Sequence, residues 1–242
     1  MRVIVALLLL LLPLSSYAST QVQVSVAATN DDVYIDRHTA SPFDTTAYLN
    51  DPIGVYLGHY SADYQQDGGF RFLSVAIPSG ATIDSAWIVF ASTGVQSGTT
   101  CNWRYRGEDT ASAAIFSTVA NWRTRILTTA SVDSSSMAAY PADGVTVRSP
   151  LITSIVQEIV SRGDWSSGNN MAILVFNNSS STGAYRKPES YEDAGTAPAQ
   201  LNIWYTASGG GGGADSSKTS IHSPANTYKV HSPAGIGAIH KP

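Results

Sequence analysis

The segment from Ser149 to Phe176 constrains the fold more than any other part of the chain. Its first half predicts one amphipathic helix, in which Ser149 suits the N-cap and Pro150 suits the first helical position. Four apolar residues then recur at the spacing of a helical stripe: Ile152, Ile155, Val156 and Ile159. The second half, Met171 to Phe176, is a continuous apolar run that predicts a strand covered on both faces.

The rest of the chain reads as short strands between turn-rich loops. These strands are expected at residues 21–26, 70–77, 86–91, 101–106 and 200–205. One helix among many short strands predicts an all-β fold, namely an antiparallel β-sandwich of the jelly-roll kind with one amphipathic helix and a disordered or extended C-terminal tail.

Composition sets the expected domains. Residues 1–18 have a short positive start, an apolar run and a small-residue cleavage site, so they predict a signal peptide and a secreted, extracellular protein. Residues 19–206 are the predicted sandwich, residues 207–213 a glycine-rich linker, and residues 214–242 a tail that repeats His-Ser-Pro-Ala. Two interpretations of the tail stay open: a disordered or sorting segment, or an extended segment that docks onto a neighbouring chain.

Charge and hydropathy each argue against one kind of partner. The formal net charge is −4 and only 13% of residues are charged, whereas nucleic-acid binding needs a basic surface. After the N-terminal segment, no stretch is apolar enough to predict a membrane span. The single cysteine, Cys101, excludes an intrachain disulfide and is expected to be a small buried residue.

No sequence motif points to catalysis. The nucleophile-elbow, zinc-protease and phosphate-loop patterns are missing from the sequence, and four candidate carboxylates have no recognisable catalytic frame: Glu108, Glu158, Glu189 and Asp193. The protein is therefore not expected to be an enzyme, and a hydrolase or lyase is the least favoured alternative. Arg71 lies in a predicted buried strand and needs a carboxylate partner, for which Glu108 and Glu189 are the candidates.

Acidic residues near the first strands suggest a structural calcium ion. Asp31, Asp32 and Asp36, together with Asn30, offer closely spaced oxygen ligands of the kind that Ca²⁺ prefers. The alternative is an Asx turn that caps a strand.

Aromatic residues are the best indication of a ligand. Tyr60, Tyr64, Tyr185 and Tyr191 lie in or beside predicted loops, and the last two flank Arg186 and Glu189. Sugars pack C–H groups on aromatic rings while their hydroxyls bond to neighbouring polar groups, so these six residues are candidate glycan ligands. Scattered surface tyrosines are the alternative. Four other aromatic residues are expected in the core: Trp87, Trp103, Tyr105 and Trp204.

Four pieces of the sequence, in order, resemble a known family of exported modules. The first is residues 69–72 with 75–83 and Ala86, the second is residues 107–108 with Ala111 and Phe116, and the third is residues 129–132. The fourth is residues 149–150, 156–160, Arg162, Trp165 and 168–169, closing with Arg186, Ser190 and residues 199–205. They are similar to the jelly-roll modules described as DNRLRE or disaggregatase-related domains, which are carbohydrate-binding-like. The chain departs from this pattern after Val132, where the family continues to a tryptophan and this sequence has Asp133 to Ser136.

The resemblance implies a noncatalytic extracellular carbohydrate-binding or adhesion module whose partner is a polysaccharide or glycan surface. The alternative is a structural subunit of a surface layer, fibre or particle, in which the tail contacts copies of the same chain.

Overall fold

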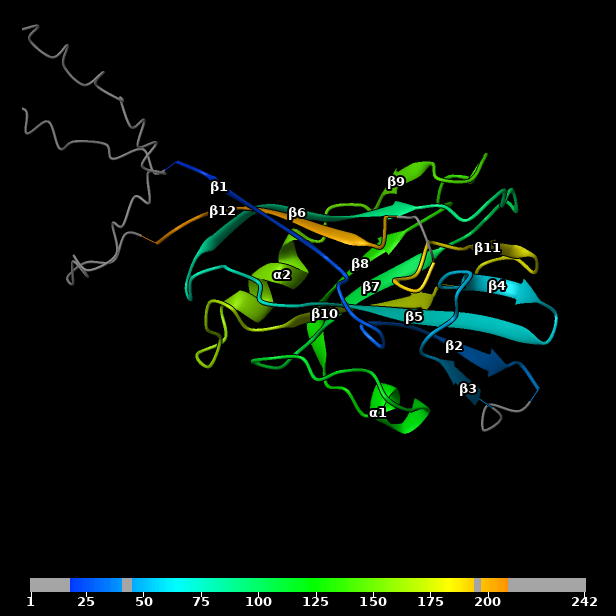
Figure 1. The fold of residues 1–242 in the computed structure, drawn as a ribbon, viewed down its shortest axis with the longest axis horizontal. Coiled ribbons are helices and arrows are strands. Elements are labelled where there is room, and N and C mark those ends of the chain that lie inside the picture. The colour runs from blue at the N-terminus through cyan, green and yellow to red at the C-terminus, as the bar shows by residue number, and fades with distance from the viewer. Residues whose placement is uncertain (1–17, 41–44, 194–196, 209–242) are drawn as a thin grey trace, which may run out of the picture. The chain divides into compact units, whose positions relative to one another are not determined.

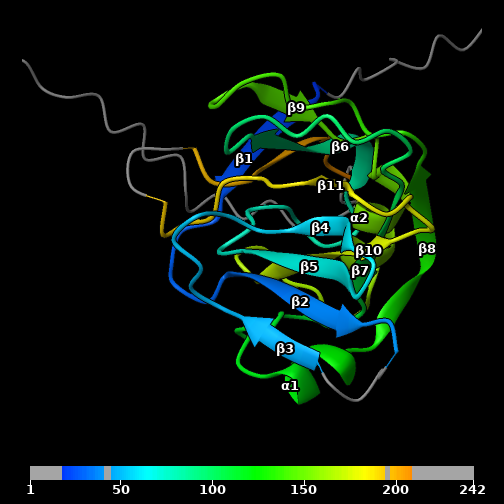
Figure 2. The ribbon, with the colours of Figure 1, turned by 90° about the vertical axis from the view of Figure 1, so that its right-hand side faces the viewer.

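A computed structural model describes residues 18–40, 45–193 and 197–208. In these residues the strands form two antiparallel sheets with a shared core between them (Figures 1 and 2). The small sheet has the order β1 (Thr20–Ser25), β12 (Gln200–Thr206), β6 (Thr82–Ala91) and β9 (Thr146–Arg148). The predicted all-β sandwich is therefore confirmed.

The large sheet branches at its central strand. Its main path is β11 (Ala184–Arg186), β4 (Leu57–Ser61), β5 (Tyr64–Phe72), β10 (Met171–Asn177), β7 (Trp103–Glu108) and β8 (Leu127–Ser134). Strand β2 (Asp32–His38) pairs along one edge of β5 and carries β3 (Thr45–Tyr48). The other edge of β5 is shared, because Gly68 pairs with β10 whereas Gln66 pairs with β4.

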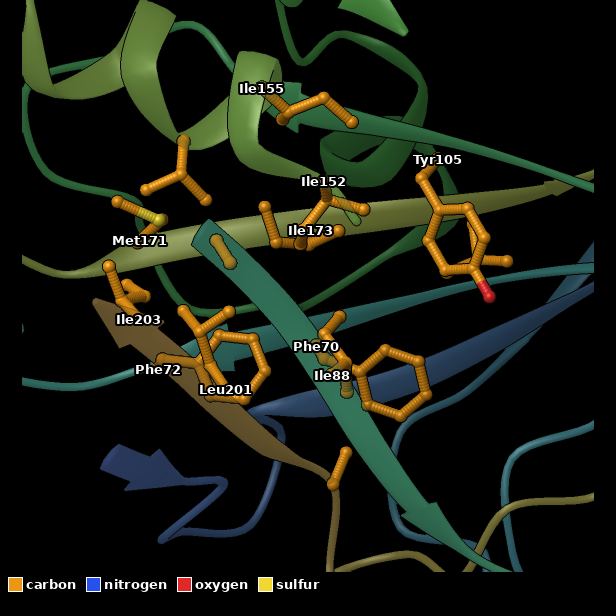
Figure 3. Packing of buried hydrophobic residues seen from close by; sticks show 14 of the residues in the cluster. Phe70, Phe72, Ile88, Tyr105, Ile152, Ile155, Met171, Ile173, Leu201 and Ile203 are labelled. Carbon is orange, nitrogen blue, oxygen red and sulfur yellow. The ribbon is translucent and has the colours of Figure 1, made fainter. Parts of the chain in front are cut away.

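The main core lies where the two sheets face each other (Figure 3). Strand β10 contributes to two cores, because its side chains alternate between the two faces of the large sheet. Ile173 and Val175 point into the main core, whereas Ala172 and Leu174 belong to a second cluster on the outer face. Met171 to Val175 are all buried, as the apolar run predicted.

Helix α2 (Thr153–Val160) packs its apolar stripe onto the main core, where Ile155 lies above β10 in Figure 3. The predicted start of the helix is wrong. Its N-cap position is Ile152, with no side-chain capping bond. The Ser149 hydroxyl instead accepts a 2.9 Å hydrogen bond from the Ile88 amide and so anchors the chain to the small sheet.

A short second helix, α1 (Val119–Arg123), was not predicted. Thr118 caps it by accepting a 3.0 Å hydrogen bond from the Asn121 amide. Its buried Trp122 lies against Phe176 with ring centroids 5.3 Å apart. Helix α1 and the preceding Phe116 thereby cover part of the outer face of the large sheet, on the lower side in Figure 1.

Two of the four aromatic residues expected in the core are elsewhere. Trp103 and Tyr105 are fully buried. Trp87 and Trp204 are only half-buried. Trp87 lies opposite Asn202, and Trp204 is two residues further along the same strand, so both rings lie on the outward face of the small sheet. The Arg148 guanidinium lies 3.6 Å from the Trp87 ring centroid and covers part of that ring.

The arginine in strand β5 has a different partner from either of the two expected. Arg71 forms a 2.5 Å ion pair with Asp31 and donates from Nε to the Ala113 carbonyl. Glu108 instead pairs with Arg125. Cys101 is buried, and burial raises the pKa of its thiol to about 11, so the predicted role as a small buried residue fits.

The predicted signal peptide (residues 1–18) lies outside the described residues except for Ala18, and so do the predicted linker (residues 207–213), except for its first two residues, and the predicted tail (residues 214–242). Where the structure is described, none of its helices has the length and apolarity needed to cross a membrane.

Candidate functional site

The register of the large sheet aligns residues that are distant in sequence. Asp36 of β2 lies opposite Thr46 of β3 on one side and Gln66 of β5 on the other. Gln66 lies opposite Gly58 of β4, and Gly58 lies opposite Tyr185 of β11. Because directly opposed residues share one face of a sheet, this row crosses five strands on a single face.

Tyrosine rings continue this face. Tyr34 stacks on Tyr48 at 4.5 Å and contacts Tyr56 at 5.1 Å between ring centroids. Tyr185 lies 5.8 Å from Tyr56 and 5.1 Å from Tyr60. We call these five side chains, which form one chain of ring contacts, the tyrosine platform: Tyr34, Tyr48, Tyr56, Tyr60 and Tyr185.

The platform is an outward extension of the main core. Tyr34 is only 6% exposed and belongs to the core, and Tyr56 packs against it. Tyr48 and Tyr60 are 38% and 48% exposed, so their rings are available to a ligand. The buried rings fix the positions of the exposed ones, and this limits the side-chain entropy that a ligand would have to remove.

A pocket of about 190 Å³ opens beside the platform, lined by Tyr34, Asp36, Asp51, Tyr56, Tyr60 and Gln66. Its polar groups are held by the protein. The Tyr34 hydroxyl donates to Asp51 Oδ2 at 3.1 Å, and Gln66 Nε2 donates to Asp36 Oδ1 at 2.9 Å. The Tyr60 amide donates to Gln66 Oε1 at 3.0 Å, which fixes the Gln66 amide.

Burial sets the electrostatics of the pocket. Desolvation raises the pKa of Asp36, although hydrogen bonds from Gln66 and Tyr48 oppose the shift. Desolvation also raises the pKa of the Tyr56 and Tyr185 hydroxyls, so both stay neutral donors. The Lys187 ammonium lies 5.1 Å from the Tyr56 ring centroid, and burial lowers its pKa.

Two glycines let neighbouring strands of the large sheet pack closely beneath the platform: Gly58 against β11 and Gly68 against Leu57 of β4. Gly58 has φ +124°, and a Cβ there would lie 2.6 Å from the Ala184 carbonyl oxygen. A Cβ on Gly68 would lie 2.5 Å from Leu57 Cδ2. A side chain at either position would push β11 or Leu57 away and separate the rings above.

The six predicted glycan ligands divide into two groups. Tyr60 and Tyr185 are part of the tyrosine platform. Tyr64 lies on the same face one row further along, opposite His38, whose ring meets its ring edge-on at 5.2 Å.

The other three serve the local structure. Arg186 is 2% exposed and donates to the carbonyl groups of Tyr185, Met137 and Ala138. Glu189 is buried and accepts a 2.8 Å hydrogen bond from the Ala197 amide. Tyr191 is exposed, its amide donates to Asp32, and the ring contacts of the platform do not include it.

Sequence reasoning missed three platform tyrosines and two polar pocket residues: Tyr34, Tyr48, Tyr56, Asp51 and Gln66. Tyr34 stands between Val33 and Ile35 in a strand whose first four residues are all buried, so alternation does not single it out. The sequence signal that points to the site is the density of tyrosines between residues 34 and 64, because nothing local shows that their rings meet.

The three predicted calcium ligands have separate environments. Asp31 is fully buried and paired with Arg71, and Asp36 lines the pocket. Burial and the nearby Glu192 and Asp31 charges raise the pKa of Asp32 to about 7. Among the described residues, no group of three or more acidic, histidine or cysteine side chains is placed to hold a metal ion. Calcium binding therefore stays a prediction.

No protein-family model matches the chain, and no curated protein matches it either.

Proposed function

We propose that this protein is a noncatalytic carbohydrate-binding module whose binding surface is the tyrosine platform and its pocket. The observation that carries the proposal is the continuous contact of five tyrosine rings beside Asp36, Asp51 and Gln66. The proposed partner is a polysaccharide or glycan surface outside the cell, as the predicted signal peptide suggests.

The chemistry of the surface suits a sugar. Pyranose C–H groups pack on exposed rings such as Tyr60 and Tyr48. Sugar hydroxyls donate to the Asp36 and Asp51 carboxylates and accept from the Gln66 amide or a tyrosine hydroxyl. The pocket of about 190 Å³ is smaller than a drug-sized site of ~300–1,000 Å³, so it suits one sugar unit, with neighbouring units on the exposed rings.

Glycan-array screening followed by calorimetry tests the proposal. Tyr60→Ala and Tyr185→Ala each remove a ring from the platform and are expected to weaken binding of the selected glycan about tenfold or more, equivalent to ~1.4 kcal/mol. Tyr191→Ala is the matched control, because it removes an exposed tyrosine that makes no ring contact with the platform. No glycan bound by the wild type, or equal losses in all three variants, would contradict the proposal.

A further inference from the structure

The outer face of the large sheet changes from apolar to basic along its strands. Val33 and Ile35 of β2 lie in the apolar cluster under Trp122 and Phe116. Two residues further along β2, on the same face, is Arg37. Strand β7 places Arg104 and Arg106 on this face too, opposite Phe176 and Leu174 of β10.

These three arginines line one hollow of about 300 Å³, together with Asn177 and Asn178. We call these five residues the arginine hollow. An adjoining hollow of about 320 Å³ shares Arg37 and adds Arg123. Four of the 14 lysine and arginine residues in a chain of net charge −4 thus gather on one face of one sheet.

Nearby carboxylates neutralise only part of this charge. Asp67 also lines the hollow, where it forms a 2.5 Å ion pair with Arg37, and its side chain is 3% exposed. Asp133 forms a two-pronged pair with Arg104, at 2.6 and 2.7 Å. Arg106 has no carboxylate partner among the described residues and donates to the Thr128 carbonyl. Three guanidinium groups therefore face two carboxylates, and one positive charge remains.

Each arginine also keeps donors available. Arg37, Arg104 and Arg106 bond to the described part of the chain through Nε or Nη2, and none of the three Nη1 groups forms a hydrogen bond with it. Their other nitrogens are tied to Asp67, Asp133 and Thr128, which hold the planar groups in place. Fixed guanidinium groups are the preferred protein donors to oxyanions.

We propose that the arginine hollow binds a tetrahedral oxyanion, namely a sulfate or phosphate group. Donors from three guanidinium groups exceed what the two oxygens of a planar carboxylate use, and four oxygens suit them better. The group can be a free ion or an ester on a polysaccharide. This site lies on the opposite face of β2 from the tyrosine platform and does not depend on the proposed function.

Calorimetry on the full chain with sodium sulfate and with sodium phosphate, at ionic strength matched with sodium chloride, tests the site. We expect saturable binding of at least one anion by the wild type. The double variant Arg104→Gln/Arg106→Gln should bind at least tenfold more weakly. It leaves the ion pair between Arg37 and the buried Asp67 intact, and circular dichroism checks that the variant folds. Arg104→Lys keeps the charge without the planar fork and should fall between the two.

Arg148→Gln is the matched control, because it removes one arginine charge from the other sheet and should leave the affinity unchanged. Tyr60→Ala/Tyr185→Ala should also keep the anion affinity, which separates this site from the platform. Dextran sulfate compared with dextran identifies the source: tighter binding of dextran sulfate than of inorganic sulfate indicates a polymer-borne ester, and equal or weaker binding indicates the free ion. Absence of saturable binding of both inorganic anions would overturn the proposal, as would equal weakening by Arg148→Gln.

Discussion

At the scale of single residues, Asp32 is a carboxyl group in an unfavourable place. It is 2% exposed, and burial, Glu192 and Asp31 raise its pKa to about 7 from an ordinary 3.8. A pKa raised in the folded state means that folding favours the protonated form. The Asp32 contribution to stability is therefore greatest below pH ~4 and is lost as the pH rises to about 7.

Asp32→Asn should stabilise the protein at pH 8 by as much as about 4 kcal/mol, the equivalent of the shift from 3.8 to about 7. The asparagine oxygen can still accept the hydrogen bond that the Tyr191 amide gives to Asp32. Urea unfolding at pH 5 and pH 8 measures the effect. Asp63→Asn, at an exposed position, is the control and should change little. Equal stabilities of wild type and Asp32→Asn at pH 8 would contradict the assignment.

We expect Asp36 to make the proposed glycan binding depend on pH. Burial raises its pKa above 3.8, and only the ionised carboxylate accepts hydrogen bonds at both oxygens. We expect the affinity for the selected glycan to fall as the pH is lowered from 7 through the pKa of Asp36. Asp36→Asn should bind more weakly at pH 7 and lose that dependence. Calorimetry across this range measures it, and an unchanged pH profile in the variant would exclude Asp36 as a ligand.

At the scale of elements, helix α2 stabilises the sandwich through its apolar stripe and through Glu158. The Glu158 carboxylate accepts 2.7 Å hydrogen bonds from the amides of Thr129 and Ala130, which ties the helix to β8. The stripe lies on β7 at Gly107, where a Cβ would come within 2.6 Å of Ile159 Cδ1. The helix therefore closes the end of the core at a point where the large sheet has no side chain of its own.

Ile155→Ala should lower the free energy of unfolding by ~2–5 kcal/mol, because Ile155 is fully buried and its loss leaves a cavity. Leu151→Ala is the matched control: Leu151 precedes the same helix, is 52% exposed, and should change stability by less than about 0.5 kcal/mol. Chemical denaturation of both variants measures the difference. Similar losses would mean that the helix is not held by this stripe.

At the scale of the whole molecule, the question is whether the chain acts alone or assembles. We expect a chain without residues 214–242 to keep its melting temperature and its glycan affinity, because the platform and both cores lie within residues 18–208. Size-exclusion chromatography with light scattering on both forms tests the alternative. Concentration-dependent assembly that disappears with residues 214–242 would instead favour the structural subunit.

The sequence by itself determined the fold class and the strands β10 and β12, whereas the strand expected at residues 70–77 is only the end of β5 (Tyr64–Phe72). Period-two alternation placed Trp103 and Tyr105 in the core, and the run from Met171 to Phe176 marked a strand covered on both faces, of which all but Phe176 are buried. These features are local, because apolar spacing reports directly which side of a strand or helix faces away from water. Alternation did not distinguish Trp87 and Trp204 from core residues, because an outward face can also carry large rings.

Only the tertiary structure decided which polar and aromatic groups meet. Asp36, Gln66 and Tyr185 share a row because of strand register, and Arg71 pairs with Asp31 rather than with Glu108 or Glu189. A one-residue shift in register would move each of these side chains to the opposite face. The pattern of a single strand indicates which of its residues are buried, but the pairing of separate strands determines the neighbours. The platform and the arginine hollow, on opposite faces of β2, both depend on that pairing.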